Sequence, residues 1–390
     1  MFTSENRNGT LVIFLAGRID SNSADAAEKE LNTLRAEAPD AELVLDAEKL
    51  EYISSAGLRV VLRLRKANPT MKIVNVTDEI YDIFEMTGFS EIIPVERAFK
   101  TMSVEGCKEI GRGAKGTVYR YNGDTAIKVY KSPDSLPDIN RERELARRAF
   151  VLGVPTAISY AIVKVGESYG SVFELLDAKS FSELLAEDPS TMDKYVGMFT
   201  ELLKTIHTTK VSPDEMPDIK LLIAKWLKDD AKFLADEENA KLAAMVAAVP
   251  DTDNMIHCDY HTNNVMLQNG EAILIDMDTL SHGHPIFELA NIHIAYVGFG
   301  EIDHAMVENF IHLPYDLTCE FWNRFFRLYT GITDPVKLEE AENKVKLLSY
   351  VRLLRHYSRR NDMGDRLQEI TEKCVSLVKE MLAKVDSLTF

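Results

Sequence analysis

The sequence predicts an α/β domain over residues 1–98 and, after a short linker, an α+β domain whose second half is largely helical. Two observations lead to this division. In the first hundred residues, short apolar strands alternate with helical patterns, which is typical of a small α/β layer fold. Further on, a glycine-rich stretch lies between two strand-like segments, and helical patterns then fill most of the chain beyond residue 177.

The first domain is expected to contain repeated pairs of a strand and a helix. The expected strands cover 10–17, 42–46 and 71–76. The helical patterns that follow them cover about 22–37, 57–66 and 79–86. Because each strand is separated from the next by a helix, the three strands are expected to share one sheet.

Two serines, Ser54 and Ser55, stand directly before the second helix of this domain. A phosphate on Ser55 would be stabilised there by the backbone amides and the dipole of a helix N-terminus. Serine is also a common helix N-cap, so the alternative is that Ser54 or Ser55 caps this helix and has no further role. The sequence leaves both interpretations open.

The second domain begins with a G-x-G-x-x-G-x-V pattern formed by Gly111, Gly113, Gly116 and Val118. Glycines allow backbone amides to approach phosphates that larger residues would hold off. A dinucleotide-binding loop has the same glycine spacing but opens a helix. Here apolar alternation resumes at Val118, so the pattern predicts a strand–loop–strand cover over the phosphates of ATP.

Lys128 lies in a strand-like segment after the glycine pattern, from which it can reach the α- and β-phosphates. A helical pattern over 140–150 follows and carries Glu142 and Glu144. The glutamate that pairs with Lys128 would fix the lysine over the nucleotide. We expect Glu144 to do so, from its distance to Pro155, and Glu142 is the close alternative; the other glutamate is then a solvated charge.

The segment 169–177 is expected to be a buried strand that runs into a hinge. Backbone groups of Glu174 and Leu176 could bond the edge of an adenine there. This assignment depends on their position alone.

Asp259, Asn264 and Asp276 have the chemistry that phosphoryl transfer needs. Asp259 and Asn264 belong to an H-x-D-x-x-x-x-N pattern, and Asp276 follows after about one hairpin of chain. Asp259 is the candidate carboxylate that orients or deprotonates the attacking hydroxyl. Asn264 and Asp276 are the candidate oxygen ligands of Mg²⁺. A polar loop between strands would have similar residues, so the interpretation depends on the glycine pattern and Lys128 as well.

Residues of about 106–390 resemble the kinase-fold phosphotransferases of the aminoglycoside and choline kinase type. The resemblance is carried by the glycine pattern, Lys128, the loop 257–264, the segment 274–278 and the run 283–290. It implies a protein kinase-like fold with an N-lobe over 104–176 and a helical C-lobe over 177–390. It also implies that phosphate is transferred from ATP to a hydroxyl of a small-molecule acceptor.

Two positions in the run 283–290 define how this chain relates to that family. Glu288 keeps an acidic residue of the family pattern and is expected to hold the catalytic loop in place. His284 departs from the pattern, because an acidic residue stands there in the family. Asp278, in the preceding segment, is expected to support the same loop.

Other functions remain open. His261 stands where a Ser/Thr protein kinase would have lysine, and only six residues separate Asp276 from Gly283, which leaves no room for a long activation segment. Both features favour a small-molecule acceptor. The alternatives are a protein-serine kinase, which could act on Ser55, and a partner-switching regulator that binds nucleotide and transfers nothing.

Residues 1–98 resemble a STAS domain, the fold of the anti-sigma-factor antagonists. The segments 17–20, 52–59 and 83–89 carry this resemblance. The phosphorylated serine of that family falls on Ser55, with Ser54 in place of the preceding Asp and Ala56 in place of the following Ser/Thr. The resemblance implies a regulatory or docking domain with a protein partner.

The composition is typical of a soluble, cytoplasmic protein. No apolar run approaches the roughly 18 residues of a membrane helix. The four cysteines are scattered and form no CxxC pair, so no zinc site or disulfide framework is expected. A formal charge of −17 argues against a nucleic-acid partner and is compatible with a cationic acceptor.

A basic cluster near the end of the chain contrasts with this acidic composition. It consists of Arg352, Arg355, His356, Arg359 and Arg360. The cluster could receive an anionic group or could balance acidic residues nearby. We expect the second.

Overall fold

The computed structural model describes residues 2–7, 9–113, 115–360 and 365–389. The chain forms two compact units. The first comprises Met1–Glu105 and Ile162–Gly170, and the second comprises Gly106–Ala161 and Ser171–Phe390. The segment Ile162–Gly170 groups with the first unit because strand β6 (Lys100–Thr101) pairs in parallel with Val163 and Lys164.

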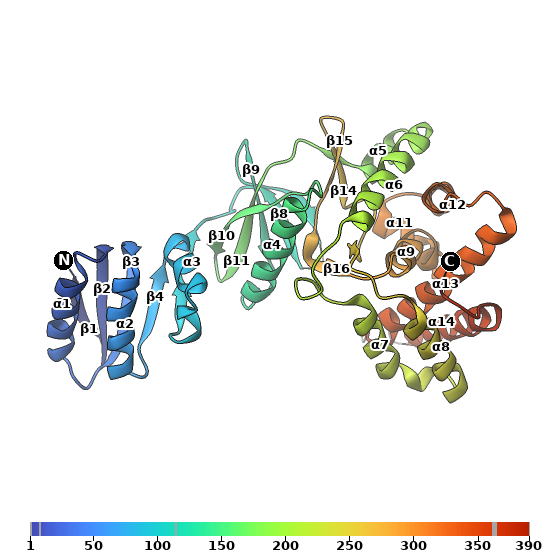
Figure 1. The fold of residues 1–390 in the computed structure, drawn as a ribbon. Coiled ribbons are helices and arrows are strands. Elements are labelled where there is room, and N and C mark those ends of the chain that lie inside the picture. The colour runs from blue at the N-terminus through green and yellow to red at the C-terminus, as the bar shows by residue number, and fades with distance from the viewer. Residues whose placement is uncertain (1, 8, 114, 361–364, 390) are drawn as a thin grey trace. The chain divides into compact units, whose positions relative to one another are not determined.

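The first unit contains a five-stranded sheet in the order β1-β2-β3-β4-β5. Its strands are β1 (Thr3–Arg7), β2 (Thr10–Ile19), β3 (Glu42–Ile53), β4 (Lys72–Val76) and β5 (Val95–Arg97). β1 is antiparallel to β2, and the remaining neighbours are parallel. The crossovers that parallel strands require are α1 (Ala24–Ala36), α2 (Ser55–Ala67) and α3 (Asp78–Met86) (Figure 1).

The core of this unit follows from side chains that alternate along its strands. In β2, Leu11, Ile13 and Leu15 are buried and the residues between them are partly exposed, as expected for a strand with one covered face. Val60, Val61 and Leu64 of α2 are buried in the same hydrophobic cluster. The predicted α/β fold is confirmed.

The second unit begins with strands β7 (Lys108–Arg112), β8 (Gly116–Arg120) and β9 (Thr125–Tyr130). Helix α4 (Leu136–Val151) follows, and then β10 (Ser159–Val165) and β11 (Ser168–Glu174). The strands lie in one sheet in the order β6-β10-β11-β9-β8-β7. β7 and β8 form an antiparallel hairpin around the glycine pattern, which confirms the predicted strand–loop–strand arrangement.

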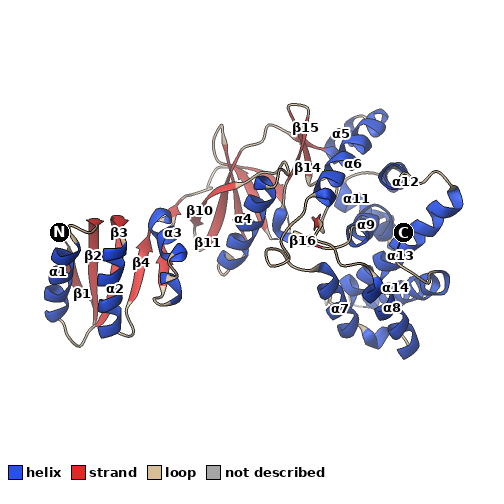
Figure 2. Ribbon diagram, in the orientation of Figure 1, coloured by secondary structure: helices blue, strands red, loops and turns tan. Residues whose placement is uncertain are grey.

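Helices make up most of the chain that follows (Figure 2). They include α5 (Phe181–Glu187), α6 (Met192–Thr208), α7 (Ile219–Asp229), α8 (Asp236–Ala248), α9 (Ile286–His293), α10 (Phe299–Ile302), α11 (His304–Ile311), α12 (Tyr315–Thr330), α13 (Pro335–Ser358) and α14 (Asp365–Lys384). A π-helical stretch over Ile294–Gly298 joins α9 to α10. The part of the chain beyond residue 177, expected to be mostly helical, includes residues 361–364, which lie outside the described residues.

Two small sheets hold the central loops of this helical part. One consists of β12 (Lys179–Ser180), β14 (Val265–Gln268) and β15 (Glu271–Leu274), and the other of β13 (Met255–Ile256) and β16 (Ser281–His282). Trp322, Phe325 and Phe326 are buried among the helices, as core aromatics should be. Among the described residues, no helix combines the length and the apolar character needed to cross a lipid bilayer.

Candidate active site

The glycine pattern lies at the ends of β7 and β8 that face each other along the chain. The backbone amide of Gly113 donates to the carbonyl of Gly116 over 2.9 Å. A Cβ atom on Gly116 would lie 2.5 Å from the carbonyl oxygen of Val129, so only glycine fits against the neighbouring strand. A Cβ atom on Gly111 would meet nothing closer than 3.8 Å. The fold does not by itself require glycine at Gly111, and its backbone is free to approach a ligand.

Lys128 lies at the centre of an ion-pair network. Its Nζ atom is 2.9 Å from Oε1 of Glu142 and 2.9 Å from Oδ1 of Asp276. Val118 is its direct partner across the β8–β9 ladder, so their side chains share one face of the sheet. Burial alone would lower the pKa of Lys128, but the carboxylates of Asp276 and Glu142 raise it above its ordinary value. The Lys128 side chain is therefore protonated and positively charged at neutral pH.

The prediction that Glu144 pairs with Lys128 is wrong, because Glu142 makes that contact. The two glutamates are two positions apart on α4 and so point in nearly opposite directions. Glu144 lies on the outer side and pairs with Arg148 over 2.7 Å. Glu142 lies on the buried side, whose other members are Ile139, Leu145, Ala146 and Ala149. This apolar period was present in the sequence and would have selected Glu142.

Tyr130 is a further member of the network that the sequence did not indicate. Its hydroxyl donates to Oε2 of Glu142 over 2.8 Å. Tyr130 follows Lys128 by two positions on β9, so both side chains lie on the same face of the strand. Each oxygen of the Glu142 carboxylate thus has its own donor, which fixes the plane of the carboxylate against Lys128.

Asp259 and Asn264 lie in one hydrogen-bonded loop. The amide nitrogen of Asn264 donates to the main-chain oxygen of Asp259 over 3.0 Å. Because the nitrogen is used in this way, a cation would be held by the amide oxygen. The backbone amide of Ile275 donates to the carbonyl of Asn264 over 2.9 Å, which places Asp276 beside Asn264.

The Asp259 carboxylate is ionised and accessible. Burial acts to raise its pKa, but a hydrogen bond with His261 and electrostatic interactions with His261, His257 and Arg352 lower it to about 2. The side chain is 45 % exposed, so a substrate hydroxyl can reach it. A carboxylate with this pKa is a weak base in the ground state, and its first contribution is to orient the hydroxyl.

Glu288 fixes the backbone of the catalytic loop through hydrogen bonds. Its side chain is completely buried and accepts hydrogen bonds from the backbone amides of His257 and, over 2.8 Å, Cys258. Cys258 has a φ of +66°, a left-handed conformation that costs free energy in a residue other than glycine. The bonds to Glu288 offset that cost, and the expected role of Glu288 is confirmed.

His284, which stands where the family pattern has an acidic residue, accepts a hydrogen bond at the start of α9. Its Nδ1 atom accepts a hydrogen bond from the backbone amide of Ile286 over 3.2 Å, at the start of α9. Burial and the nearby His207 lower the pKa of His284, which favours the neutral ring that can accept such a bond. A short polar side chain would cap this helix in the same manner.

A third acidic side chain, Asp278, lies beside the two that contact Lys128, Glu142 and Asp276. Carboxylate oxygens of Glu142, Asp276 and Asp278 lie within 4.8 Å of one another. Asp278 forms an ion pair with Lys115 of the glycine loop, and its side chain is only 11 % exposed. The sequence predicted Asp276 as a metal ligand and gave Asp278 a supporting role, whereas the structure brings Asp276 into contact with Lys128 and Asp278 into contact with Lys115. Carboxylate and amide oxygens are the donor set that Mg²⁺ prefers.

The adenine contacts assigned to the hinge residues Glu174 and Leu176 stay a prediction. Glu174 is the last residue of β11, and Leu176 follows it in an irregular segment. Between them, the backbone amide of Leu175 donates to the carbonyl of Asp124 over 2.8 Å. This bond fixes the backbone on which Glu174 and Leu176 would contact an adenine.

The serine pair of the first unit has divided roles. Ser54 is the N-cap of α2, and its hydroxyl accepts a long bond of 3.4 Å from the backbone amide of Gly57. A Cβ atom on Gly57 would lie 2.7 Å from the carbonyl oxygen of Ile19, so glycine is required where α2 meets the sheet. Ser55 is the first residue of α2 and is exposed. The capping function therefore belongs to Ser54.

Two family descriptions match the chain. The phosphotransferase enzyme family (APH) matches residues 106–317, and the STAS domain matches residues 2–102. BtrV of Bordetella bronchiseptica, named as an anti-sigma factor antagonist, is 34 % identical over 110 residues, which are 25 % of this chain and 94 % of BtrV. The anti-sigma F factor antagonist of Paenibacillus polymyxa is 22 % identical over 95 residues, which are 23 % of this chain and 81 % of that protein.

Similar solved structures are aminoglycoside phosphotransferases. The gentamicin complex of APH(2")-IIa has a TM-score of 0.48 and 16 % identity, and the match covers 77 % of this chain and 97 % of that one. A thermostable mutant of APH(4)-Ia has a TM-score of 0.49 and 13 % identity, and the match covers 71 % of this chain and 94 % of that one. The family matches confirm both resemblances predicted from the sequence.

Proposed function

Because the chain belongs to the phosphotransferase enzyme family, we propose that it transfers a phosphoryl group from ATP, with Mg²⁺, to a hydroxyl of a small-molecule acceptor. The observation that supports this most is the contact of Lys128 with both Glu142 and Asp276, 2.9 Å from each. These residues come from three separate elements, and their convergence next to Asn264 is what nucleotide chemistry requires.

Each residue then has a distinct role. Lys128 contacts the α- and β-phosphates, and Glu142 and Tyr130 hold it there. The backbone of the glycine loop covers the phosphates. Asp259 orients the acceptor hydroxyl and takes its proton as the bond to phosphorus forms. Asn264 and Asp276 would hold Mg²⁺, which when bound neutralises charge on the phosphates.

Replacement of the proposed metal ligand tests the cofactor. Asp276→Ala is expected to abolish magnesium-dependent turnover, while nucleotide still binds more weakly through Lys128 and the glycine loop. Calorimetric titrations with ATP, carried out with Mg²⁺ and with a chelator, measure both effects. The same titration of Asp253→Ala, which changes an exposed aspartate of a loop, is the control. Absence of magnesium–ATP binding by the intact chain would contradict the proposed function.

A second candidate function concerns the STAS domain. Ser55 is exposed at the start of α2, whereas Ser54 supplies the cap. The similarity to anti-sigma factor antagonists supports a role in which Ser55 is phosphorylated, by this kinase domain or by another kinase, and a protein partner is thereby released. A phosphate adds about −1.5 to −2 charge. That charge would be stabilised by the helix N-terminus and would repel an acidic partner surface.

Mass spectrometry after incubation with magnesium–ATP tests this role. We expect phosphate on Ser55 in the unmodified chain and none there in Ser55→Ala. Loss of the phosphate in Asp259→Ala as well would identify the kinase domain of this protein as its source. Ser54→Ala is the matched control, because it changes the neighbouring hydroxyl and leaves Ser55 in place. An unphosphorylated Ser55 in protein isolated from cells would exclude the role.

A further inference from the structure

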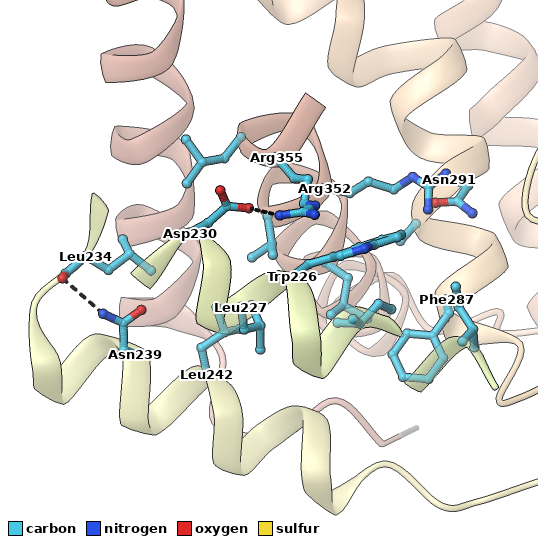
Figure 3. A pocket seen from close by; sticks show the side chains of 16 residues that line it. Trp226, Leu227, Asp230, Leu234, Asn239, Leu242, Phe287, Asn291, Arg352 and Arg355 are labelled. Atoms are coloured by element: carbon cyan, nitrogen blue, oxygen red, sulfur yellow. Dashed lines mark hydrogen bonds and ion pairs between the residues drawn. The ribbon is translucent and has the colours of Figure 1, made fainter. Parts of the chain in front are cut away.

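A small cavity lies between α7, α8, α9 and α13 (Figure 3). Its volume is about 30 Å³, which admits only a small chemical group. Most of its lining is apolar, and includes Ile223, Leu227, Phe287, Ala290, Leu348 and Leu354. The polar side chains of its lining include Asn291 and Arg352, which are drawn side by side in Figure 3.

The polar end of the cavity adjoins the proposed catalytic residue. The side-chain amide of Asn291 donates to the carbonyl of Cys258 over 3.0 Å. Nη2 of Arg352 lies 3.5 Å from the same oxygen. Since Cys258 directly precedes Asp259, and the charge of Arg352 acts on Asp259, a group bound at this end would lie close to Asp259.

The two arginines of the cavity differ in their partners. Arg355 forms ion pairs with Asp229 over 3.1 Å and with Asp230 over 3.2 Å. This agrees with the expectation that the basic cluster balances acidic residues. Arg352 differs from this expectation. Within the described ranges of the chain, no carboxylate lies within ion-pair distance of Arg352.

Arg352 therefore has hydrogen-bond donors available for a ligand, although its charge also acts on the nearby Asp259. It is half-buried, and its guanidinium lies 5.2 Å from the centre of the Trp226 ring. Burial of an unpaired charge is unfavourable, and the single long bond to Cys258 uses one of the five N–H donors of the guanidinium. The Trp226 ring lies against the guanidinium, and the N–H donors that Cys258 does not use can bond the two oxygens of a carboxylate.

We propose that this cavity is the specificity subsite for the phosphoryl acceptor, and that the acceptor carries a compact anionic group bound by Arg352. The inference rests on the proposed phosphotransferase function. A volume of about 30 Å³ suits a group the size of a carboxylate and excludes a whole sugar ring. A polycationic acceptor would be repelled by Arg352, so the overall acidic charge does not decide the sign of the substrate.

Tryptophan fluorescence provides a direct test. The chain has two tryptophans, and Trp322 is 1 % exposed in the core, so Trp226 reports on the cavity. The full chain, saturated with magnesium–ADP to occupy the nucleotide site, is titrated with glycerate, glycerol and serinol. These three-carbon alcohols differ chiefly in being anionic, neutral and cationic. We expect a saturable change with glycerate alone, and its loss in Trp226→Phe.

Variants of Arg352 make the test specific. Arg352→Gln is expected to weaken glycerate binding about tenfold or more, as loss of a bond between charged groups does. Arg327→Gln, a change at an exposed arginine of α12, should leave it unaltered. Thermal unfolding shows whether each variant folds. If Arg352→Gln does not fold, Arg352→Lys, which keeps the charge and loses the planar fork, serves instead and should also weaken binding.

Several outcomes would overturn the proposal. They are a response to serinol or glycerol as strong as that to glycerate, no response to glycerate, or a response that the Arg352 variants leave unchanged. The readout is binding and requires no phosphoryl transfer. A chain that binds glycerate through Arg352 but binds no magnesium–ATP would therefore refute the proposed function and keep the anion subsite.

Discussion

Asp259→Asn is expected to lower the rate of phosphoryl transfer by about 10²–10⁴-fold, the usual contribution of a positioned general base. Asparagine keeps the size of the side chain and leaves the backbone carbonyl that Asn264 bonds. It removes the negative charge that orients the hydroxyl and accepts its proton. Binding of magnesium–ATP should change little, because no proposed nucleotide contact involves Asp259.

Release of labelled phosphate or ADP, with the acceptor panel and with water as the acceptor, measures this rate. Asp253→Asn is the matched control, since Asp253 is an exposed loop aspartate close to Asp259 in sequence. A rate in Asp259→Asn equal to that of the control would exclude Asp259 as the base.

The same carboxylate sets an expectation for pH. The pKa of Asp259 is lowered from 3.8 to about 2. The carboxylate is thus fully ionised from neutral pH down to the ordinary value, and is protonated only as the pH falls toward 2. Protonation of Asp259 should therefore cause no loss of rate between pH 7 and 5, and any loss in that range must come from another group.

The parts of the fold that could be predicted are those with a strong local pattern. The helical patterns over about 22–37, 57–66 and 79–86 gave α1, α2 and α3 with every end correct to within about two residues. Strands without such a pattern were missed. The residues of β1 are polar and mostly exposed, and pair with β2 only through the backbone, so they show no apolar alternation. β5 is three residues long, too short for a period of two to be visible.

The candidate site shows the same division. Lys128, Asp259, Asn264 and Asp276 lie in short motifs, and the structure brings Lys128 into contact with Asp276 as phosphate chemistry requires. The proximity of Arg352 to Trp226 had no comparable signal, because the two residues lie on separate helices whose packing no local pattern encodes. The sequence therefore indicated the candidate catalytic residues and not the proposed acceptor subsite.

The choice between Glu142 and Glu144 can be decided by one pair of matched variants. Glu142→Gln is expected to lower kcat/KM for ATP by about 10–100-fold. The reason is that Lys128 loses one of its two carboxylate partners and is no longer held over the phosphates. A hydrogen bond to a charged group contributes about 1.5–3 kcal/mol, and each 1.4 kcal/mol of transition-state stabilisation is about a factor of ten in rate.

Glu144→Gln makes the same chemical change two residues away on the same helix. Glu144 contacts Arg147 and Arg148 at the surface, where an ion pair contributes at most about 1 kcal/mol to stability and none to phosphate binding. Its kcat/KM for ATP should stay within about twofold of the unmodified chain, since surface substitutions seldom propagate to a distant site. Equal losses in the two variants would mean that α4 acts as a whole. A larger loss in Glu144→Gln than in Glu142→Gln would favour the assignment that the sequence predicted, because it would mean that Glu144 and not Glu142 positions Lys128.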